Sequence, residues 1–101
     1  MQIRVGNKEI GENSPCFIIA ECGINFNGSL DLAKKLIDAA VEAGCDAAKF
    51  QAFTAENMYP KTAGELERQD YSFPIYEAVK KFELPKDWVP ALKQYCAEKG
   101  I

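Results

Sequence analysis

The N-terminal part of the chain alternates short β-prone runs with turn residues. Ile3–Val5 and Lys8–Ile10 are two such runs, and the Gly6-Asn7 pair between them is a strong hairpin signal. Polar residues 11–15 follow, and residues 16–20 then form an apolar run. The pattern predicts a β-hairpin that leads into a buried strand.

Apolar positions recur at helical spacing after this strand. Ser29 is a favourable helix N-cap and Gly44 a favourable stop. The residues between them place one apolar face toward a core: Leu32, Ala33, Leu36, Ile37, Ala40 and Val41. Residues 47–51 then predict a second buried strand, which carries one charged residue, Lys49.

The second half of the chain is less regular. Residues 54–74 are polar and lack periodicity, which predicts a long loop or a short helix within a loop. A short helix is expected over residues 75–82, and another between an N-cap at Asp87 and a terminator at Gly100.

Strands that alternate with helices predict an α/β fold with a parallel sheet and right-handed crossovers. Two or three such strands do not complete a domain of this class, since a closed eight-stranded barrel takes about 250 residues. Residues 1–101 are therefore interpreted as one incomplete domain, the N-terminal portion of a larger domain.

Composition narrows the possible functions. With 12 basic and 15 acidic residues the net charge is −3, which gives no electrostatic footprint for nucleic acid or for an anionic membrane. No apolar run is long enough to span a bilayer and no signal peptide is apparent, so a cytoplasmic location is expected.

The four cysteines lack CxxC spacing and the chain has no histidine, so we expect reduced thiols and no zinc site.

Three polar side chains are expected at the carboxyl ends of the two buried strands. Glu21 ends the first strand, and Lys49 and Gln51 alternate onto one face near the end of the second. Ligands of parallel α/β folds gather at these ends. Because an ammonium there needs an anionic partner, Lys49 is a candidate ligand for a phosphate or carboxylate. A purely structural ion pair between Glu21 and Lys49 is the alternative.

The turn after the first strand carries two further candidates. Asn25 and Asn27 could present donors to a ligand near the N-terminus of the following helix. The same residues, together with Gly28, suit a plain turn before an N-cap. The local pattern leaves both interpretations open.

The segment FIIAECGINFNGSLDLAKKLIDAAVEAGCDAAKFQ, residues 17–51, resembles the N-terminal signature of the N-acetylneuraminate (sialic acid) synthase family. That family includes relatives that make legionaminic and pseudaminic acids and spore-coat polysaccharide biosynthesis proteins. The resemblance rests on the AE.GIN.NG turn combined with KFQ, and it continues through IYEAVKKFELPKDW and YCAEKGI. It implies that the chain is the N-terminal portion of a (β/α)8 TIM barrel, preceded by a short β-hairpin.

The resemblance also implies a reaction. Family members condense phosphoenolpyruvate with an N-acylated amino sugar such as N-acetylmannosamine, release phosphate and use Mn²⁺ or Mg²⁺. By this analogy Glu21 lies near the sugar and the reacting centre, Lys49 binds phosphoenolpyruvate and Gln51 contacts the sugar. Two positions depart from the family pattern. Phe26 replaces a histidine and would make the entrance to the site at the strand ends apolar. Asp70 falls where family members have an asparagine that helps to hold phosphoenolpyruvate, and its negative charge would repel that ligand if the side chain pointed inward.

The family's metal-binding histidines would lie beyond Ile101, so the chain alone is expected to bind no metal and to be inactive. The full-length enzyme is expected to be a homodimer. Two alternatives remain. The chain could be a stand-alone, self-associating binding module, or it could belong to a related enzyme that condenses phosphoenolpyruvate with an aldose phosphate.

Overall fold

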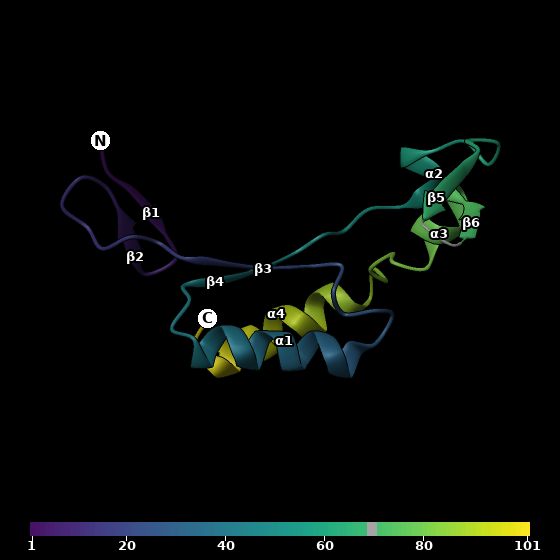
Figure 1. Cartoon of the computed structure of the whole chain (residues 1–101). Coiled ribbons are helices and arrows are strands. Elements are labelled where there is room, and N and C mark those ends of the chain that lie inside the picture. The colour runs from purple at the N-terminus through teal and green to yellow at the C-terminus, as the bar shows by residue number, and fades with distance from the viewer. Residues whose placement is uncertain (69–70) are drawn as a thin grey trace.

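The computed structural model of the chain describes residues 1–68 and 71–101. A hairpin, a β-α-β unit, a second hairpin flanked by two short helices, and a final helix follow one another along the chain (Figure 1). The strands are β1 (Ile3–Val5), β2 (Lys8–Ile10), β3 (Ile19–Gly23), β4 (Ala47–Phe50), β5 (Glu65–Arg68) and β6 (Tyr71–Pro74). The helices are α1 (Leu30–Glu42), α2 (Ala55–Met58), α3 (Ile75–Lys80) and α4 (Trp88–Lys99).

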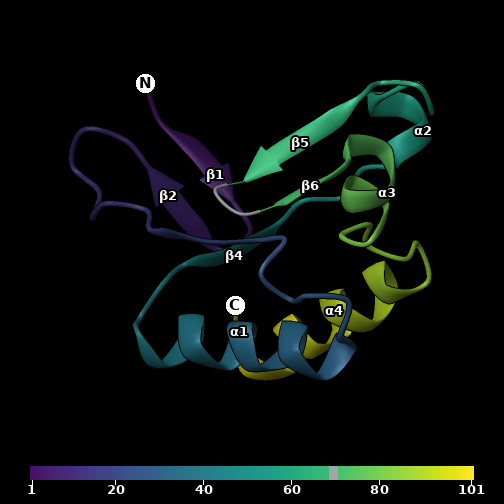
Figure 2. The same ribbon diagram turned by 45° about the vertical axis from the view of Figure 1, so that its right-hand side comes forward.

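The described strands form three separate two-stranded sheets. β1 pairs with β2 and β5 with β6 in antiparallel fashion, whereas β3 and β4 are parallel and are joined through α1. Helices α1 and α4 lie side by side along one face of β3 and β4 (Figures 1 and 2). The predicted hairpin, parallel pairing and α/β class are thus confirmed, while the described strands do not close into a barrel.

The hydrophobic core lies between the two long helices and the β3–β4 pair. Its buried cluster consists of Phe26, Ala33, Ile37, Leu84 and Leu92. The ring of Phe26 packs against Phe50 at 6.3 Å and against Trp88 at 6.0 Å between centroids, separations typical of favourable aromatic pairs. This packing holds the turn after β3 against α4.

The starts of the two long helices differ in how well local rules predict them. Ser29 has extended backbone angles and its side chain accepts a hydrogen bond from the Leu32 amide at 3.2 Å, as expected of an N-cap. Asp87 also occupies an N-cap position, but its backbone is already helical and its side chain makes no capping bond. Gly100 ends α4 in the left-handed conformation, as predicted. None of the described helices has both the length and the apolar character needed to cross a membrane.

The first buried strand was predicted in the wrong place. The strand comprises Ile19–Gly23 rather than residues 16–20, because its ladder can begin only where its partner begins, and Ile19 pairs with Ala47. Burial was also overestimated. Ile18 and Ile19 are 50 % and 54 % exposed, since the strand has a neighbour on one side only within the described chain.

The segment of residues 54–74, predicted as a long loop or a short helix within a loop, contains the short helix α2. It also holds the β5–β6 hairpin, which was not expected and which continues directly into α3. The hairpin has no hydrophobic alternation to signal it, since β5 reads Glu-Leu-Glu-Arg, and it is defined by backbone pairing from Glu65 opposite Pro74. Helix α3 ends at Lys80, two residues before the predicted end.

Candidate active site

The candidate site lies at the carboxyl ends of β3 and β4. Glu21 stands opposite Lys49 in the parallel register, and Lys49 Nζ donates to Glu21 Oε2 at 2.8 Å. The two side chains are 56 % and 61 % exposed, respectively. Such an exposed pair contributes less than about 1 kcal/mol to stability. The pair therefore leaves the ammonium accessible to a second anion, and the cost expected for a buried charge does not arise in this chain.

Gln51 follows Lys49 on the same side of the pair. The alternation predicted for this strand is confirmed, because Phe50 packs against the core while Lys49 and Gln51 are exposed. The Gln51 backbone N–H donates to the carbonyl of Gly23 at 3.1 Å, so the two strand ends remain joined beyond the last ladder pair. Glu21, Lys49 and Gln51 are thus brought together as predicted.

Asn25 and Asn27 are exposed and belong to the turn that links β3 to α1. Their backbone amides donate to the carbonyls of Cys22 at 3.0 Å and Ile24 at 3.3 Å, and Asn27 adopts a left-handed conformation with φ of 47°. These features suit turn formation. The structure shows no contact between either asparagine side chain and Glu21 or Lys49, so their predicted ligand role stays a prediction.

Phe26 corrects one sequence-based expectation. Its side chain has no exposed surface and belongs to the core cluster, so it does not form an apolar rim at the mouth. The departure from histidine at this position is therefore a matter of packing between the turn and α4. The other departure, Asp70, lies outside the described residues.

Cys22, directly beside Glu21, is a structural thiol. It is 5 % exposed, and burial first, then the Glu21 charge, raises the pKa of its thiol. A thiol with a raised pKa is a poor nucleophile. All four cysteines are free in the structure.

Metal binding has little support from these residues. The described part of the chain contains no group of three or more His, Cys, Asp or Glu side chains that could hold an ion. At the candidate site Glu21 already accepts from Lys49, which competes with a cation for the same carboxylate. The residues described do not by themselves fit the divalent metal that the resemblance implies.

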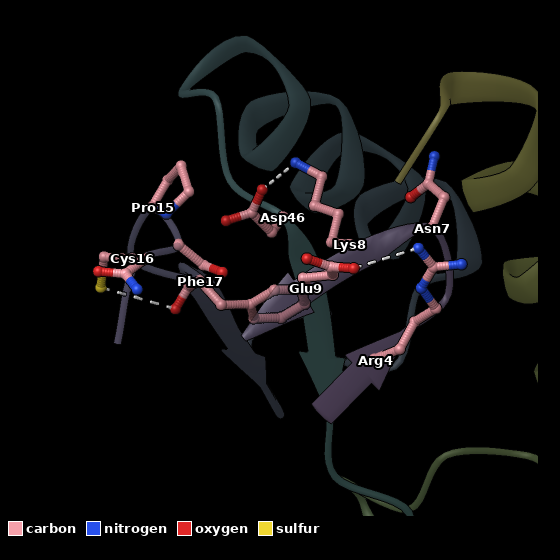
Figure 3. A pocket seen from close by; sticks show the side chains of 10 residues that line it. Arg4, Asn7, Lys8, Glu9, Pro15, Cys16, Phe17 and Asp46 are labelled. Carbon is pink, nitrogen blue, oxygen red and sulfur yellow. Dashed lines mark hydrogen bonds and ion pairs between the residues drawn. The ribbon is translucent and has the colours of Figure 1, made fainter. Parts of the chain in front are cut away.

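A cavity of about 470 Å³ lies at the opposite, amino end of the strands (Figure 3). Its charged groups are paired with one another: Lys8 contacts Asp46, Asp46 Oδ2 also accepts from the Ile18 amide at 2.7 Å, and Arg4 lies 3.4 Å from Glu9. Charges that are already paired offer little to a ligand. We therefore place the candidate site at the carboxyl ends of β3 and β4 and not at this cavity.

Two residues of interest were missed from the sequence. Gly23, at the end of β3, lies beside Glu21 and Gln51, and Asp46 ties the N-terminal hairpin to the start of β3. The glycine of the AE.G motif was a visible signal for the first. The second had none, because the contacts of Asp46 bridge 38 and 28 positions of sequence.

Comparisons with known proteins show which family the chain resembles. Residues 36–101 match the sequence model of the NeuB family. The chain is 46 % identical to the spore coat polysaccharide biosynthesis protein SpsE of Bacillus subtilis, covering 97 % of this chain and 26 % of that protein. It is 45 % identical to the N,N'-diacetyllegionaminic acid synthase of Legionella pneumophila, covering 95 % of this chain and 28 % of the synthase.

A solved structure extends the similarity to the fold. The N-acetylneuraminic acid synthetase of Leptospira borgpetersenii, crystallised with citrate, superposes with a TM-score of 0.80 at 37 % identity, covering all of this chain and 32 % of that one. The chain thus spans about a quarter of the length of the curated relatives it matches. Since the family match includes more than half of its residues, the chain belongs to the NeuB family.

Proposed function

We propose that the protein containing this chain is a nonulosonic acid synthase, which condenses phosphoenolpyruvate with an N-acylated amino sugar such as N-acetylmannosamine and releases phosphate. The observation that carries the proposal is the Lys49–Glu21 pair at the carboxyl ends of β3 and β4. It is supported by the identity to synthases of this family, two of which are named for sialic and legionaminic acids.

Each side chain has a task that its chemistry suits. The Lys49 ammonium has three donors, of which one holds Glu21, so others remain for the phosphate or carboxylate of phosphoenolpyruvate. A fixed positive charge there also stabilises the charge that develops as the carbon nucleophile attacks the open-chain aldehyde. Glu21 and Gln51 would face the sugar. Holding both substrates in line converts their bimolecular encounter into a reaction between two bound groups.

A TIM barrel, a homodimer, a cytoplasmic location and a divalent cation, Mn²⁺ or Mg²⁺, complete the proposal for the whole protein. Such a barrel requires parallel strands that are connected by helices. Strands β3 and β4 are parallel and are connected along the chain by α1, and α4 packs beside α1. The cation would have to be held by side chains other than those described, since the described residues offer no cluster for it.

The test is phosphate release by the complete product of the source gene, supplied with phosphoenolpyruvate and N-acetylmannosamine. We expect activity in the wild type and a loss of about 100-fold or more on Lys49→Ala, because a single charged donor at the reacting centre is worth that much. Lys35→Ala, on the exposed side of α1, is the matched control and should leave the rate unchanged. No phosphate release with any N-acylated amino sugar would refute the proposal.

A second candidate, self-association of the 101-residue chain, is favoured by its exposed apolar side chains. Four apolar side chains on β1 and at or just before the start of β3 are about half exposed: Ile3 at 53 %, Val5 at 46 %, Ile18 at 50 % and Ile19 at 54 %. Open sheet edges of this kind tend to pair with other chains. Sedimentation velocity of the isolated chain should show concentration-dependent association, and a monomer at every concentration would exclude this candidate.

A further inference from the structure

An insert, residues 55–80, lies along the chain between β4 and α4. Its described elements pack against one another: α2 against α3, α3 against β6, and β5 against β6. The insert rises from the carboxyl ends of β3 and β4 on the side away from α1 and α4 (Figures 1 and 2). Phe50 packs against the core beneath the strands, and Lys49, which precedes it, is exposed. Since neighbours along a strand point to opposite faces, the insert and the Lys49 side chain lie on the same side of the strands.

Two short stems connect the insert to the rest of the chain. The first stem, residues 51–54, follows β4, and the second stem, residues 81–87, leads from α3 to α4. A cavity of about 360 Å³ lies between them and is lined by side chains of both, among them Phe53 and Leu84. This space leaves the separation of the two stems to be fixed by a specific contact.

Glu83, on the second stem, supplies such a contact. Its Oε1 accepts a hydrogen bond from the backbone N–H of Ala55, the first residue of α2, at 2.7 Å, and the bond bridges 28 positions of sequence. No other hydrogen bond among the described residues joins the second stem to α2 or to the first stem. Both partners are anchored, because Ala55 is fully buried and Leu84, next to Glu83, belongs to the core cluster.

Helix α2 depends on this contact because it has little stability of its own. It consists of the four residues Ala55–Met58, and so short a helix is unstable in water by itself. Thr54 occupies the N-cap position, but its side chain makes no capping bond and its buried hydroxyl has no partner within the described part of the chain. The Glu83 carboxylate instead satisfies the first free N–H of the helix, where a negative charge is favourable.

We infer that Glu83 is a positioning residue for the proposed reaction: it binds the N-terminus of α2 and thereby fixes the insert at the carboxyl ends of β3 and β4, on the side on which Lys49 is exposed. Held there, the insert shields bound substrates from water. The inference rests on the proposed synthase function. It gives Glu83 an effect on the reaction through Ala55 and the insert rather than through contact with a substrate.

The test compares Glu83→Ala, Glu83→Gln and Glu77→Ala in the complete gene product. Glutamine keeps an oxygen that can accept from the Ala55 N–H, whereas alanine has none. Glu77, an exposed acidic residue on α3 of the same insert, provides the matched control.

We expect Glu83→Ala to lower kcat/KM for phosphate release from phosphoenolpyruvate and N-acetylmannosamine by about tenfold or more, because small displacements far from the reacting groups are costly. Glu83→Gln should stay within about threefold of the wild type, since the hydrogen bond is retained. Glu77→Ala should leave the rate unchanged. Equal rates in Glu83→Ala and Glu77→Ala, or equal losses in Glu83→Ala and Glu83→Gln, would overturn the inference.

Amide hydrogen exchange follows the insert without relying on turnover. In Glu83→Ala, the amides of α2 and α3 should exchange faster than in the wild type, while those of α1 should not change. Saturating phosphoenolpyruvate should slow exchange in α2 and α3 of the wild type and of Glu83→Gln, but not of Glu83→Ala. Faster exchange in α1 as well would show a general loss of stability and would refute a positioning role.

The two measurements separate failure of this inference from failure of the proposed function. If the wild type turns over and Glu83→Ala matches Glu77→Ala, the function stands and the inference falls. If the wild type does not turn over, but phosphoenolpyruvate protects α2 and α3 in the wild type and not in Glu83→Ala, the synthase function falls and Glu83 still fixes the insert over a bound ligand. Equal protection in both proteins, or protection in neither, refutes the inference.

Discussion

The two ends of the β3–β4 pair each carry a lysine–carboxylate contact, but the two carboxylates are used differently. At the amino end, Asp46 accepts from both Lys8 and the Ile18 amide, and its side chain is only 12 % exposed. At the carboxyl end, Glu21 accepts from Lys49 alone among the described residues and is 56 % exposed. A largely enclosed carboxylate that accepts from two groups of the protein holds the fold together, whereas an exposed one with a single donor is available to a ligand.

The largest expected difference between the two ends is in activity. Glu21→Gln should lower kcat/KM for phosphate release by the complete gene product by about 100-fold, because it removes a charge at the reacting centre. Asp46→Asn, at the opposite end of the strands, should stay within twofold of the wild type. Equal losses in the two variants would show that the two ends do not differ in function.

Stability should respond in the opposite order. In the 101-residue chain, Asp46→Asn should lower the urea midpoint, since the hairpin loses its charged link to Lys8. Glu21→Gln should change the free energy of unfolding by less than about 1 kcal/mol, as expected for an exposed pair. Circular dichroism of both variants during urea titration checks this, and a larger midpoint shift for Glu21→Gln would contradict the comparison.

The smallest expected effect is a pH dependence at the amino end. The hydrogen bond from Lys8, and then that from the Ile18 amide, lowers the pKa of Asp46 in the folded chain. A lowered carboxyl pKa adds stability above its unfolded value, and this stability is lost as pH falls through the folded value, below about pH 4. The midpoint difference between the wild type and Asp46→Asn should therefore shrink on acidification below that pH. A difference that grows there would mean that Asp46 does not act as an anion.

Local rules were sufficient where a few neighbouring residues decide the structure. The Gly6-Asn7 hairpin, the Ser29 cap and the Gly100 terminator follow from backbone preferences that hold in any context. The closeness of Glu21 and Lys49 could also be predicted from the sequence. The carboxyl ends of parallel strands meet at one edge, so Glu21 and Lys49 had to come close once both strands were recognised.

Tertiary structure decided what depends on a distant partner. The start of β3 is set by its pairing with Ala47, and Phe26 is buried because α4, over 60 residues later, supplies Trp88. Asp87 does not cap α4 because its backbone is drawn into the preceding turn. The pairing of Gly23, rather than Cys22, with Phe50 arises from a bulge that shifts one strand against the other. The sequence by itself determined which side chains reach the carboxyl ends of the two strands, because alternation along a strand is local. Only the packed chain decided how these side chains lie relative to one another, because that depends on the register of the two strands.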